Sequence, residues 1–282
     1  QQETKRQKAG QPVPYPDWDA LRQEDTEDSP LVCLTVKDHR GKVVRRVKGP
    51  VGAGIHRVAW DLRHARSAPV TQGNGKDPWR DSGSGVAALP GQYTVQLSQY
   101  VDGEFTALAA PQSFELVPLD RQSLPVDRKA KFAFETRVSQ LQHAVASLDQ
   151  SLGDAVNRVG AAKQALYGSA RKSEALILRA RKIERDLAAI TVEIRGDRSV
   201  SKRFEPTSPS LRQRINRAAG GMSTTFAPTK THQQAYQIAR DQFTALRLRL
   251  QRVVDEDLVT LEQDMDKLGV PWTPGREIPQ GH

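Results

Sequence analysis

Residues 134–166 read FETRVSQLQHAVASLDQSLGDAVNRVGAAKQAL, and apolar side chains recur in this stretch at alternating steps of four and three. Such spacing places them on one narrow stripe of an α-helix. We therefore predict a long helix that begins near Asp127, ends near Tyr167-Gly168 and buries this stripe. The stripe consists of Phe134, Val138, Leu141, Val145, Leu148, Leu152, Ala155, Val159, Ala162 and Leu166.

The same spacing continues downstream and predicts three further helices. Gly196 is placed to end the first of them, and Ser208-Pro209 opens a short one that Gly220-Gly221 breaks. The last begins after Pro228-Thr229, and its stripe contains one four-residue stutter after Leu250. Their apolar positions are Leu176, Ala180, Ile183, Leu187, Ile190 and Ile194; then Leu211, Ile215 and Met222; then Tyr236, Ala239, Phe243, Leu246, Leu250, Val254, Leu258, Leu261, Met265 and Leu268.

Helix lengths predict how these helices pack. The second apolar stripe is too short to cover the first, whereas the last one has a matching length. We therefore predict an antiparallel bundle over residues 127–270, with three long helices and one short one. The first and last helices lie side by side, and the second and the short helix share the remaining face. Uneven cover should leave an apolar strip near one end, and such strips mark contact sites.

Residues 30–118 change to the two-residue period of β-strands. LVCLTVKD at 31–38 has largely apolar faces on both sides, so the face that points to the core stays open. Asp38-His39-Arg40-Gly41 is a turn signal before KVVRRV, and the two runs predict a hairpin. HRVAWDLR at 56–63 alternates again, with Trp60 directed inward.

The rest of this segment completes the β pattern. A glycine-rich stretch from Gly73 to Gly85 predicts a mobile loop. LPGQYTVQLSQYVDGEFT at 89–106 predicts a second hairpin with Asp102-Gly103 as its turn, and SFELVP at 113–118 predicts a closing strand. Several short strands in a row indicate a small antiparallel β-sandwich.

The fold class is therefore α+β and multidomain. We expect a linker or peripheral arm at 1–29, in which Tyr15 and Trp18 can pin the arm to a neighbouring surface. The arm is followed by a sandwich at 30–118, a linker at 119–126, the bundle at 127–270 and a tail at 271–282.

Composition excludes several classes of protein. The 282 residues contain one cysteine, Cys33, which excludes an internal disulfide framework and a cysteine-based zinc site. Uninterrupted apolar runs are too short for a membrane span. The net charge is +9, and residues 127–270 supply most of it with 25 Lys+Arg against 17 Asp+Glu. Because the chain begins with Gln1 rather than Met, we expect a processed product or a piece of a longer protein.

Residues with catalytic chemistry form no convincing constellation. The consecutive carboxylates Asp255, Glu256 and Asp257 point in different directions on a helix, and the same holds for Asp264 and Asp266. The histidines lack metal-ligand spacing, and Cys33 lies between apolar strand residues, where a small buried side chain is its usual role. We predict no catalytic, cofactor-binding or metal-binding residues and no cofactor.

Two further groups of residues can be interpreted as either structural or functional. His56, Trp60 and Asp61 suggest a ligand platform, but packing in the sandwich core is the favoured reading. The basic runs at 171–172, 179–182 and 247–249 suggest nucleic-acid binding. Acidic residues interleave with them and stacking aromatics are scarce, so a solvated, paired helix face is favoured.

Several motifs of the β segment resemble one known module. In chain order, these motifs are Asp38 and Gly41, Val43-Val44-Arg45, Gly54-Ile55-His56 with Val58 and Trp60-Asp61, and Pro90-Gly91-Gln92-Tyr93-Thr94. Their order and chemistry resemble the immunoglobulin-like module related to the flagellar hook-capping protein. Three helical stretches extend the likeness: AVNRV at 155–159, SLRQRINRAAGGM at 210–222 and APT at 227–229. Together they are similar to the C-terminal region of large secreted bacterial sortilin-like, BNR-repeat proteins, which are often labelled glycosyl hydrolases and carry β-propellers.

This resemblance implies a secreted, periplasmic or cell-envelope location in a bacterium. It also implies a non-catalytic accessory region that docks on its own β-propeller or on partner subunits, with a homo-oligomer as a further option. The Asp-box of such propellers, S-x-D-x-G-x-x-W, does not occur in this sequence. One alternative is a cleft-shaping part of a carbohydrate-active enzyme whose catalytic propeller lies outside this sequence. A second is a basic helical scaffold for acidic polymers.

Overall fold

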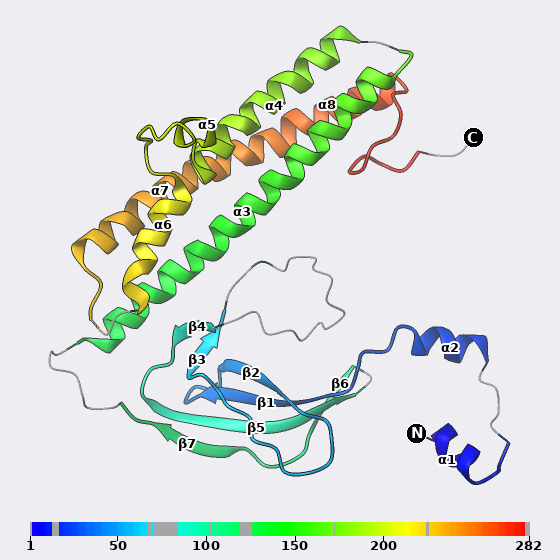
Figure 1. The fold of residues 1–282 in the computed structure, drawn as a ribbon, viewed down its shortest axis with the longest axis vertical. Helices are drawn as coiled ribbons and strands as arrows, with labels where there is room; N and C mark the ends of the chain where they lie inside the picture. The colour runs from blue at the N-terminus through cyan, green and yellow to red at the C-terminus, as the bar shows by residue number, and fades with distance from the viewer. Residues whose placement is uncertain are drawn as a thin grey trace. The chain divides into compact units, whose positions relative to one another are not determined.

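A computed structural model describes residues 2–12, 17–66, 69, 84–101, 103–118, 126–171, 173–223 and 226–279. Residue contacts divide the chain into two compact units (Figure 1). The sheet unit comprises residues 1–61 and 90–117, and the helical unit comprises residues 62–89 and 118–282. Long helices accompany an antiparallel sheet, so the α+β prediction is confirmed.

Two short helices form in the N-terminal arm, which the sequence predicted as a linker. They are α1 (Gln2–Lys8) and α2 (Trp18–Glu24). Asp17 caps α2 by accepting a hydrogen bond from the backbone N–H of Ala20 at 2.7 Å. Trp18 exposes 69% of its surface, and Tyr15 lies outside the described residues.

Five antiparallel strands form the sheet, in the order β2-β1-β5-β6, with β7 also paired to β5. Both predicted hairpins are confirmed, and β7 is the predicted closing strand. In the first turn, Gly41 has φ +77° and the carboxylate of Asp38 accepts from the backbone N–H groups of Arg40 and Lys42. Asp102 of the second turn lies outside the described residues. The strands are β1 (Leu31–Asp38), β2 (Val43–Gly49), β5 (Gly91–Val101), β6 (Glu104–Ala107) and β7 (Gln112–Leu116).

The predicted strand at 56–63 is wrong, because residues 50–61 pair with no neighbour in a ladder. Gly54 at φ +130° and Leu62 at φ +56° bend the backbone on either side of the alternating run. The predicted side-chain direction nevertheless holds for Trp60. Its ring lies 5.7 Å from that of Tyr93 and 6.2 Å from that of Phe114, measured between centroids.

Both faces of β1 contribute buried side chains, which answers the question the sequence left open. Leu31 and Cys33 are buried on one face and Val36 on the other. Val36 pairs with Val95 of β5 on its own face of the sheet. The apolar character of both faces in LVCLTVKD therefore reflects burial on both sides.

A small hairpin from the middle of the β segment belongs to the helical unit. It consists of β3 (Arg63–Ala65) and β4 (Ser84–Ala87), paired antiparallel. Gly85 of β4 lies so close to β3 that a Cβ built on it would stand 2.7 Å from the carbonyl oxygen of Ala65. The predicted glycine-rich loop thus ends in a strand, and residues 70–83 lie outside the described residues.

The helices begin and end close to the predicted positions. Asp127 caps α3, Ser173 caps α4, and Gly196 follows α4 with φ +95°. The cap of α6 is Ser210, two residues beyond the predicted Ser208, and it forms a capping box with Gln213. The helices are α3 (Arg128–Gly168), α4 (Glu174–Arg195), α5 (Arg198–Ser201), α6 (Leu211–Ala219), α7 (Lys230–Arg252) and α8 (Val259–Lys267).

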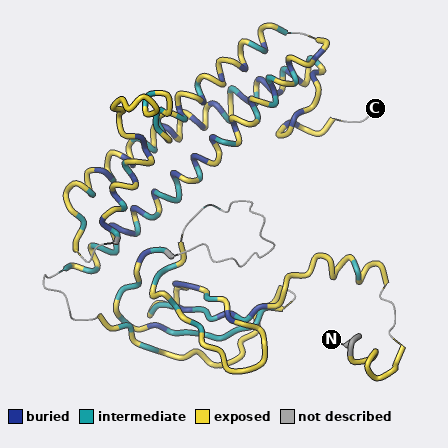
Figure 2. Tube along the Cα trace, viewed as in Figure 1, coloured by how far each residue is buried: buried dark blue, intermediate teal, exposed yellow. Residues whose placement is uncertain are grey.

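The predicted apolar stripes form one core. All ten stripe residues of α3 and all six of α4 are buried in one core cluster, and buried positions recur along both helices in Figure 2. In the last helix Tyr236, Phe243, Val254 and Leu268 are partly buried against the same core. The predicted exposed apolar strip is therefore wrong for α3 and α4, because other helices of the unit cover their stripes along the full length.

The stutter in the last stripe coincides with a π-helical stretch, Val253–Leu258, between α7 and α8. In a π-helix each N–H bonds the carbonyl five residues earlier, so one turn holds more residues than an α-turn. This extra residue compensates for the four-residue step and returns Leu258, Leu261 and Met265 to the core. A sequence irregularity is thus absorbed without breaking the helix.

Contacts between named residues give the helix directions. Phe134 near the start of α3 meets Tyr236 near the start of α7 at 5.8 Å between ring centroids, and Arg158 further along α3 meets Glu262 of α8. The first and last helices therefore run in the same direction (Figure 1). Lys163 of α3 binds Glu184 of α4, and α6 covers the part of α3 before Asp149.

Residues after α8, which the sequence predicted as a tail, fold back on the helix end. The buried guanidinium of Arg276 donates to the carboxylate of Asp266 and, at 2.7 Å, to the carbonyl oxygen of Pro271. The indole N–H of Trp272 donates at 3.0 Å to the carbonyl oxygen of Glu277. These contacts close a short loop around one arginine.

Candidate functional site

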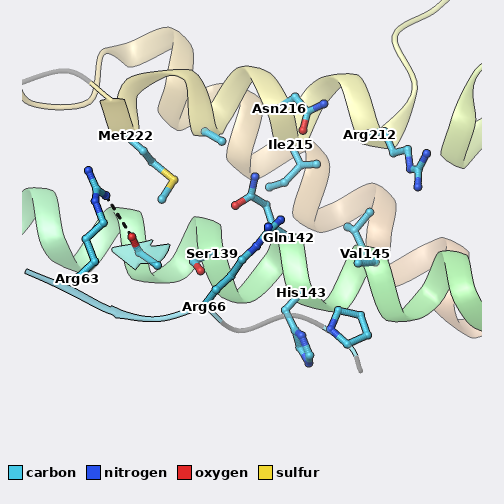
Figure 3. A pocket seen from close by; sticks show the side chains of 14 residues that line it. Arg63, Arg66, Ser139, Gln142, His143, Val145, Arg212, Ile215, Asn216 and Met222 are labelled. Atoms are coloured by element: carbon cyan, nitrogen blue, oxygen red, sulfur yellow. Dashed lines mark hydrogen bonds between the residues drawn. The ribbon is translucent and has the colours of Figure 1, made fainter. Parts of the chain in front are cut away.

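A pocket of about 570 Å³ opens in the helical unit between the β3–β4 hairpin, α3 and α6 (Figure 3). This volume is within the range of small-molecule sites, about 300–1,000 Å³. Three arginines, Arg63, Arg66 and Arg212, lie on its wall, and no Asp or Glu does among the described residues. The pocket is therefore a concave surface whose described wall includes three arginines.

Arg63 and Arg66 reach the pocket from the end of β3. The guanidinium of Arg63 donates at 3.1 Å to the carbonyl oxygen of Gly85, which fixes it across the hairpin. In Figure 3 Arg63 points toward Met222, and Arg66 points toward Gln142 of α3. The close approach of β4 to β3 at Gly85 thus positions one of the two arginines directly.

Arg212 stands at the start of α6, at the other end of the pocket from Arg63 (Figure 3). Its guanidinium binds one carboxylate oxygen of Asp149 at 2.7 Å, and Arg195 of α4 binds the other at 2.5 Å. Two guanidinium groups therefore share one carboxylate. The surroundings of Asp149 keep a net positive charge.

A second carboxylate lies close to the hairpin. Glu135 of α3 is buried, and this burial raises its pKa above the usual value of 4.5, while Lys131 and Arg63 lower it. Lys131 stands 3.4 Å from the carboxylate oxygen. The raised pKa reflects a carboxylate whose charge is destabilised by burial.

Neutral donors and an apolar wall complete the pocket. Ser139 and Gln142 of α3 and Asn216 of α6 present hydroxyl and amide groups. The Nδ1 atom of His143, another residue of the wall, is buried and has no hydrogen-bond partner among the described residues. The apolar side chains are Val145, Ala146, Ile215, Ala219 and Met222.

The sequence missed this pocket, since it predicted no site residues. Arg63 was part of the predicted strand at 56–63, whereas Arg66 and Arg212 were not singled out as candidate site residues. Only the +8 excess of residues 127–270, from 25 Lys+Arg against 17 Asp+Glu, pointed to this half of the chain. The pocket forms because the β3–β4 hairpin packs on α3. No local sequence pattern predicts this packing.

The residues weighed from the sequence do not assemble into another site. The His56 ring contacts the carbonyl oxygen of Gly52 at 2.8 Å, whereas the Trp60 ring packs against Tyr93 and Phe114. Cys33 is buried in β1, as predicted. The basic helix faces are paired, as Arg179 with Asp264 and Arg249 with Glu193.

Within the described ranges, no three His, Cys, Asp or Glu side chains gather where they could hold a metal ion. None of the helices in these ranges combines the length and the apolar character that crossing a membrane requires.

A second feature is the loop at 197–209, between α4 and α6. Phe204 exposes 98% of its surface and has φ +59°, a backbone region that phenylalanine rarely adopts. Its neighbours Lys202, Arg203 and Glu205 are also exposed. An aromatic side chain is therefore presented to solvent on a charged loop.

Local hydrogen bonds close the base of this loop. Asp197 caps α5 by accepting from the backbone N–H groups of Ser199 and Val200 at 2.8 and 3.2 Å. The backbone N–H of Phe204 donates to the carbonyl oxygen of Ser201 at 3.1 Å. At the other end Ser210 is held by the capping box of α6. Local hydrogen bonds thus fix the position of Phe204.

Comparison with protein-family models, with curated proteins and with solved structures finds no match to this chain.

Proposed function

We propose that this chain is a non-catalytic accessory module of a secreted or envelope protein, and that it docks on a β-propeller of its own parent protein or of a partner subunit. The motif likeness of residues 30–272 to the C-terminal region of sortilin-like, BNR-repeat proteins supports this proposal. In the same reading the sheet unit is an Ig-like module. The packing of Trp60 on Tyr93 and Phe114 supports this assignment.

The single observation that carries docking is the presentation of Phe204. Buried aromatic anchors supply most of the binding energy at many protein interfaces. A phenylalanine held in a strained backbone region while it is 98% exposed gains nothing from its own fold. The strain and the exposure are both explained if a partner buries the ring.

The flanking charges indicate what kind of partner surface fits. Lys202 and Arg203 precede the ring and Arg198 lies in α5, whereas the acidic residues of the loop are Glu205 and Asp197, whose carboxylate caps α5. A complementary surface has an apolar pocket for the ring and a rim that is mainly acidic. This differs from docking through the apolar stripes, which are covered.

The test starts from the protein in its source. Intact mass and co-purifying chains establish whether a propeller region is attached to this chain or bound to it. That propeller is then purified, and its affinity for the wild-type chain is compared with its affinity for Phe204→Gly and for Leu248→Gln, an exposed apolar control on α7.

We expect Phe204→Gly to weaken binding roughly tenfold or more, and Leu248→Gln to have little effect. Glycine accepts a positive φ without strain, so the Phe204→Gly chain should fold with unchanged or higher stability. A source protein with neither an attached nor a bound propeller argues against the proposal, as does equal affinity of all three chains.

A further inference from the structure

We propose that a second hollow of the helical unit, the groove between α3 and α4, binds a small elongated molecule with an apolar body and one carboxylate. The groove has a volume of about 800 Å³, which is within the range of small-molecule sites. Residues of α5 and the start of α6 line one end of it (Figure 1). Binding there does not require docking through Phe204.

The floor and walls of this groove are apolar. Val159 of α3 and Leu187 of α4 are 1% exposed and belong to the core. Val156 and Val192 lie outside the predicted apolar stripes, line the same groove and expose 46% and 43% of their surfaces. Ala188 is a third exposed apolar residue of the lining. A ligand with an apolar body would remove these surfaces from water, which favours binding.

Two ion pairs between α3 and α4 limit the length of the groove. Asp149 binds Arg195 near one end, and Lys163 binds Glu184 near the other. Residues 149 and 163 lie about 21 Å apart along α3 at 1.5 Å per residue. A long helix of a partner protein would have to cross these charged side chains, whereas a small molecule fits between them. The groove therefore favours a small ligand.

Charges differ between the two ends. Near α5, Arg195 and Arg212 are both committed to Asp149, and Asp197 accepts hydrogen bonds from two backbone N–H groups of α5. Arg198 also lines this end, and its guanidinium has no ion pair or hydrogen bond among the described residues. Three guanidinium groups thus accompany two carboxylates here, which leaves one positive charge in excess.

The opposite end has no such excess, because Lys163 neutralises Glu184. One cation at one end of an apolar groove matches a ligand with a single carboxylate at one end. The hydroxyl of Ser199, which lines the α5 end, can donate a further hydrogen bond to it. Because Arg198 is exposed, its attraction is modest and screened by salt. The apolar body therefore supplies most of the affinity.

Calorimetric titration of the full chain tests the proposal with octanoate, butyrate and 1-octanol. Each buried CH₂ group strengthens binding roughly fourfold, so octanoate should bind at least roughly tenfold more tightly than butyrate. It should bind roughly twofold to fivefold more tightly than 1-octanol, which lacks the charge. Added salt should reduce the second difference and leave the first.

Three variants tie the binding to the groove. Ala188→Phe fills it from an exposed helix position and should weaken octanoate binding roughly tenfold or more. Ala189→Phe, at the next exposed position of α4 and outside the lining, is the matched control and should bind as the wild type does. Arg198→Gln should abolish the preference for octanoate over 1-octanol.

Four results would overturn the proposal. Octanoate may show no measurable binding to the wild type, or the same affinity as butyrate. Equal binding by Ala188→Phe and Ala189→Phe would place the ligand outside the groove. A wild type without preference for octanoate over 1-octanol, or an Arg198→Gln chain that keeps this preference, would show that Arg198 binds no carboxylate.

Discussion

Arg158 of α3 and Glu262 of α8 form a two-pronged ion pair, with guanidinium-to-carboxylate distances of 3.1 Å and 2.6 Å. Glu262 is buried, and the side chain of Arg158 is 26% exposed. The pair lies one residue from Val159 and Leu261, which are core residues of the same two helices. It therefore fixes the register between the first and the last helix.

Removing one partner of this ion pair should be costly. We expect Glu262→Ala to lower the free energy of unfolding by about 3 kcal/mol, because the guanidinium of Arg158 then keeps a partly buried charge without its carboxylate. Urea unfolding followed by circular dichroism measures this difference.

The exposed pair of Arg249 and Glu193 is the control. Both of its side chains are more than one-third exposed, so Glu193→Ala should cost about 1 kcal/mol or less. Equal losses for Glu262→Ala and Glu193→Ala would show that the Arg158–Glu262 pair contributes no more than a surface pair.

A buried carboxylate with a raised pKa makes stability depend on pH. Glu135 favours the folded state fully below its usual pKa of 4.5, and this contribution is lost as pH rises through its higher folded pKa. The amide in Glu135→Gln does not ionise. We therefore expect the stability of Glu135→Gln relative to the wild type to increase between pH 4 and pH 7.

Unfolding of both chains at several pH values measures this trend. Other carboxylates titrate equally in the two chains and cancel in the difference. A constant difference would mean that folding does not shift the pKa of Glu135, and a decreasing one that its surroundings stabilise the charge, and either result contradicts the prediction.

Two glycines of the helical unit should respond in opposite ways to alanine. Gly85→Ala places a Cβ 2.7 Å from a backbone oxygen of β3, and we expect a loss of about 1–3 kcal/mol from the forced separation of the strands. Gly160→Ala on an exposed position of α3 meets no atom within 4 Å. It should stabilise the chain by about 0.5–1 kcal/mol through helix propensity.

Thermal unfolding of the two variants beside the wild type checks both signs. Gly85→Ala with unchanged stability would indicate that the hairpin moves away from α3 without cost.

The helical unit could be predicted from the sequence because its main signals are local. The apolar steps from Phe134 to Leu166 and from Leu176 to Ile194 gave the buried faces of α3 and α4, and Asp127 and Gly196 gave helix ends. Even the stutter after Leu250 was visible as a pattern. Its structural answer, a π-helical stretch, depends on packing against the rest of the core.

The remaining features depend on contacts between distant parts of the chain. The alternation at 56–63 correctly predicted the direction of the Trp60 side chain. It did not show that this segment pairs with no other strand, because pairing needs a free neighbouring strand. The left-handed backbone of Leu62 also interrupts the extended run. The cover of the α3 stripe required knowing where α6 packs. The arginine-lined pocket required knowing that β3 and β4 leave the sheet unit for the helical one.

The chain crosses between its two units more than once, because residues 62–89 interrupt the sheet unit and fold with the helices. In the sequence, β5 of the sheet unit therefore follows the β3–β4 hairpin of the helical unit. The helices that complete the helical unit come after β5. No single cut separates two self-sufficient halves. In recombination or protein engineering, the two units therefore have to be transferred together as one continuous segment.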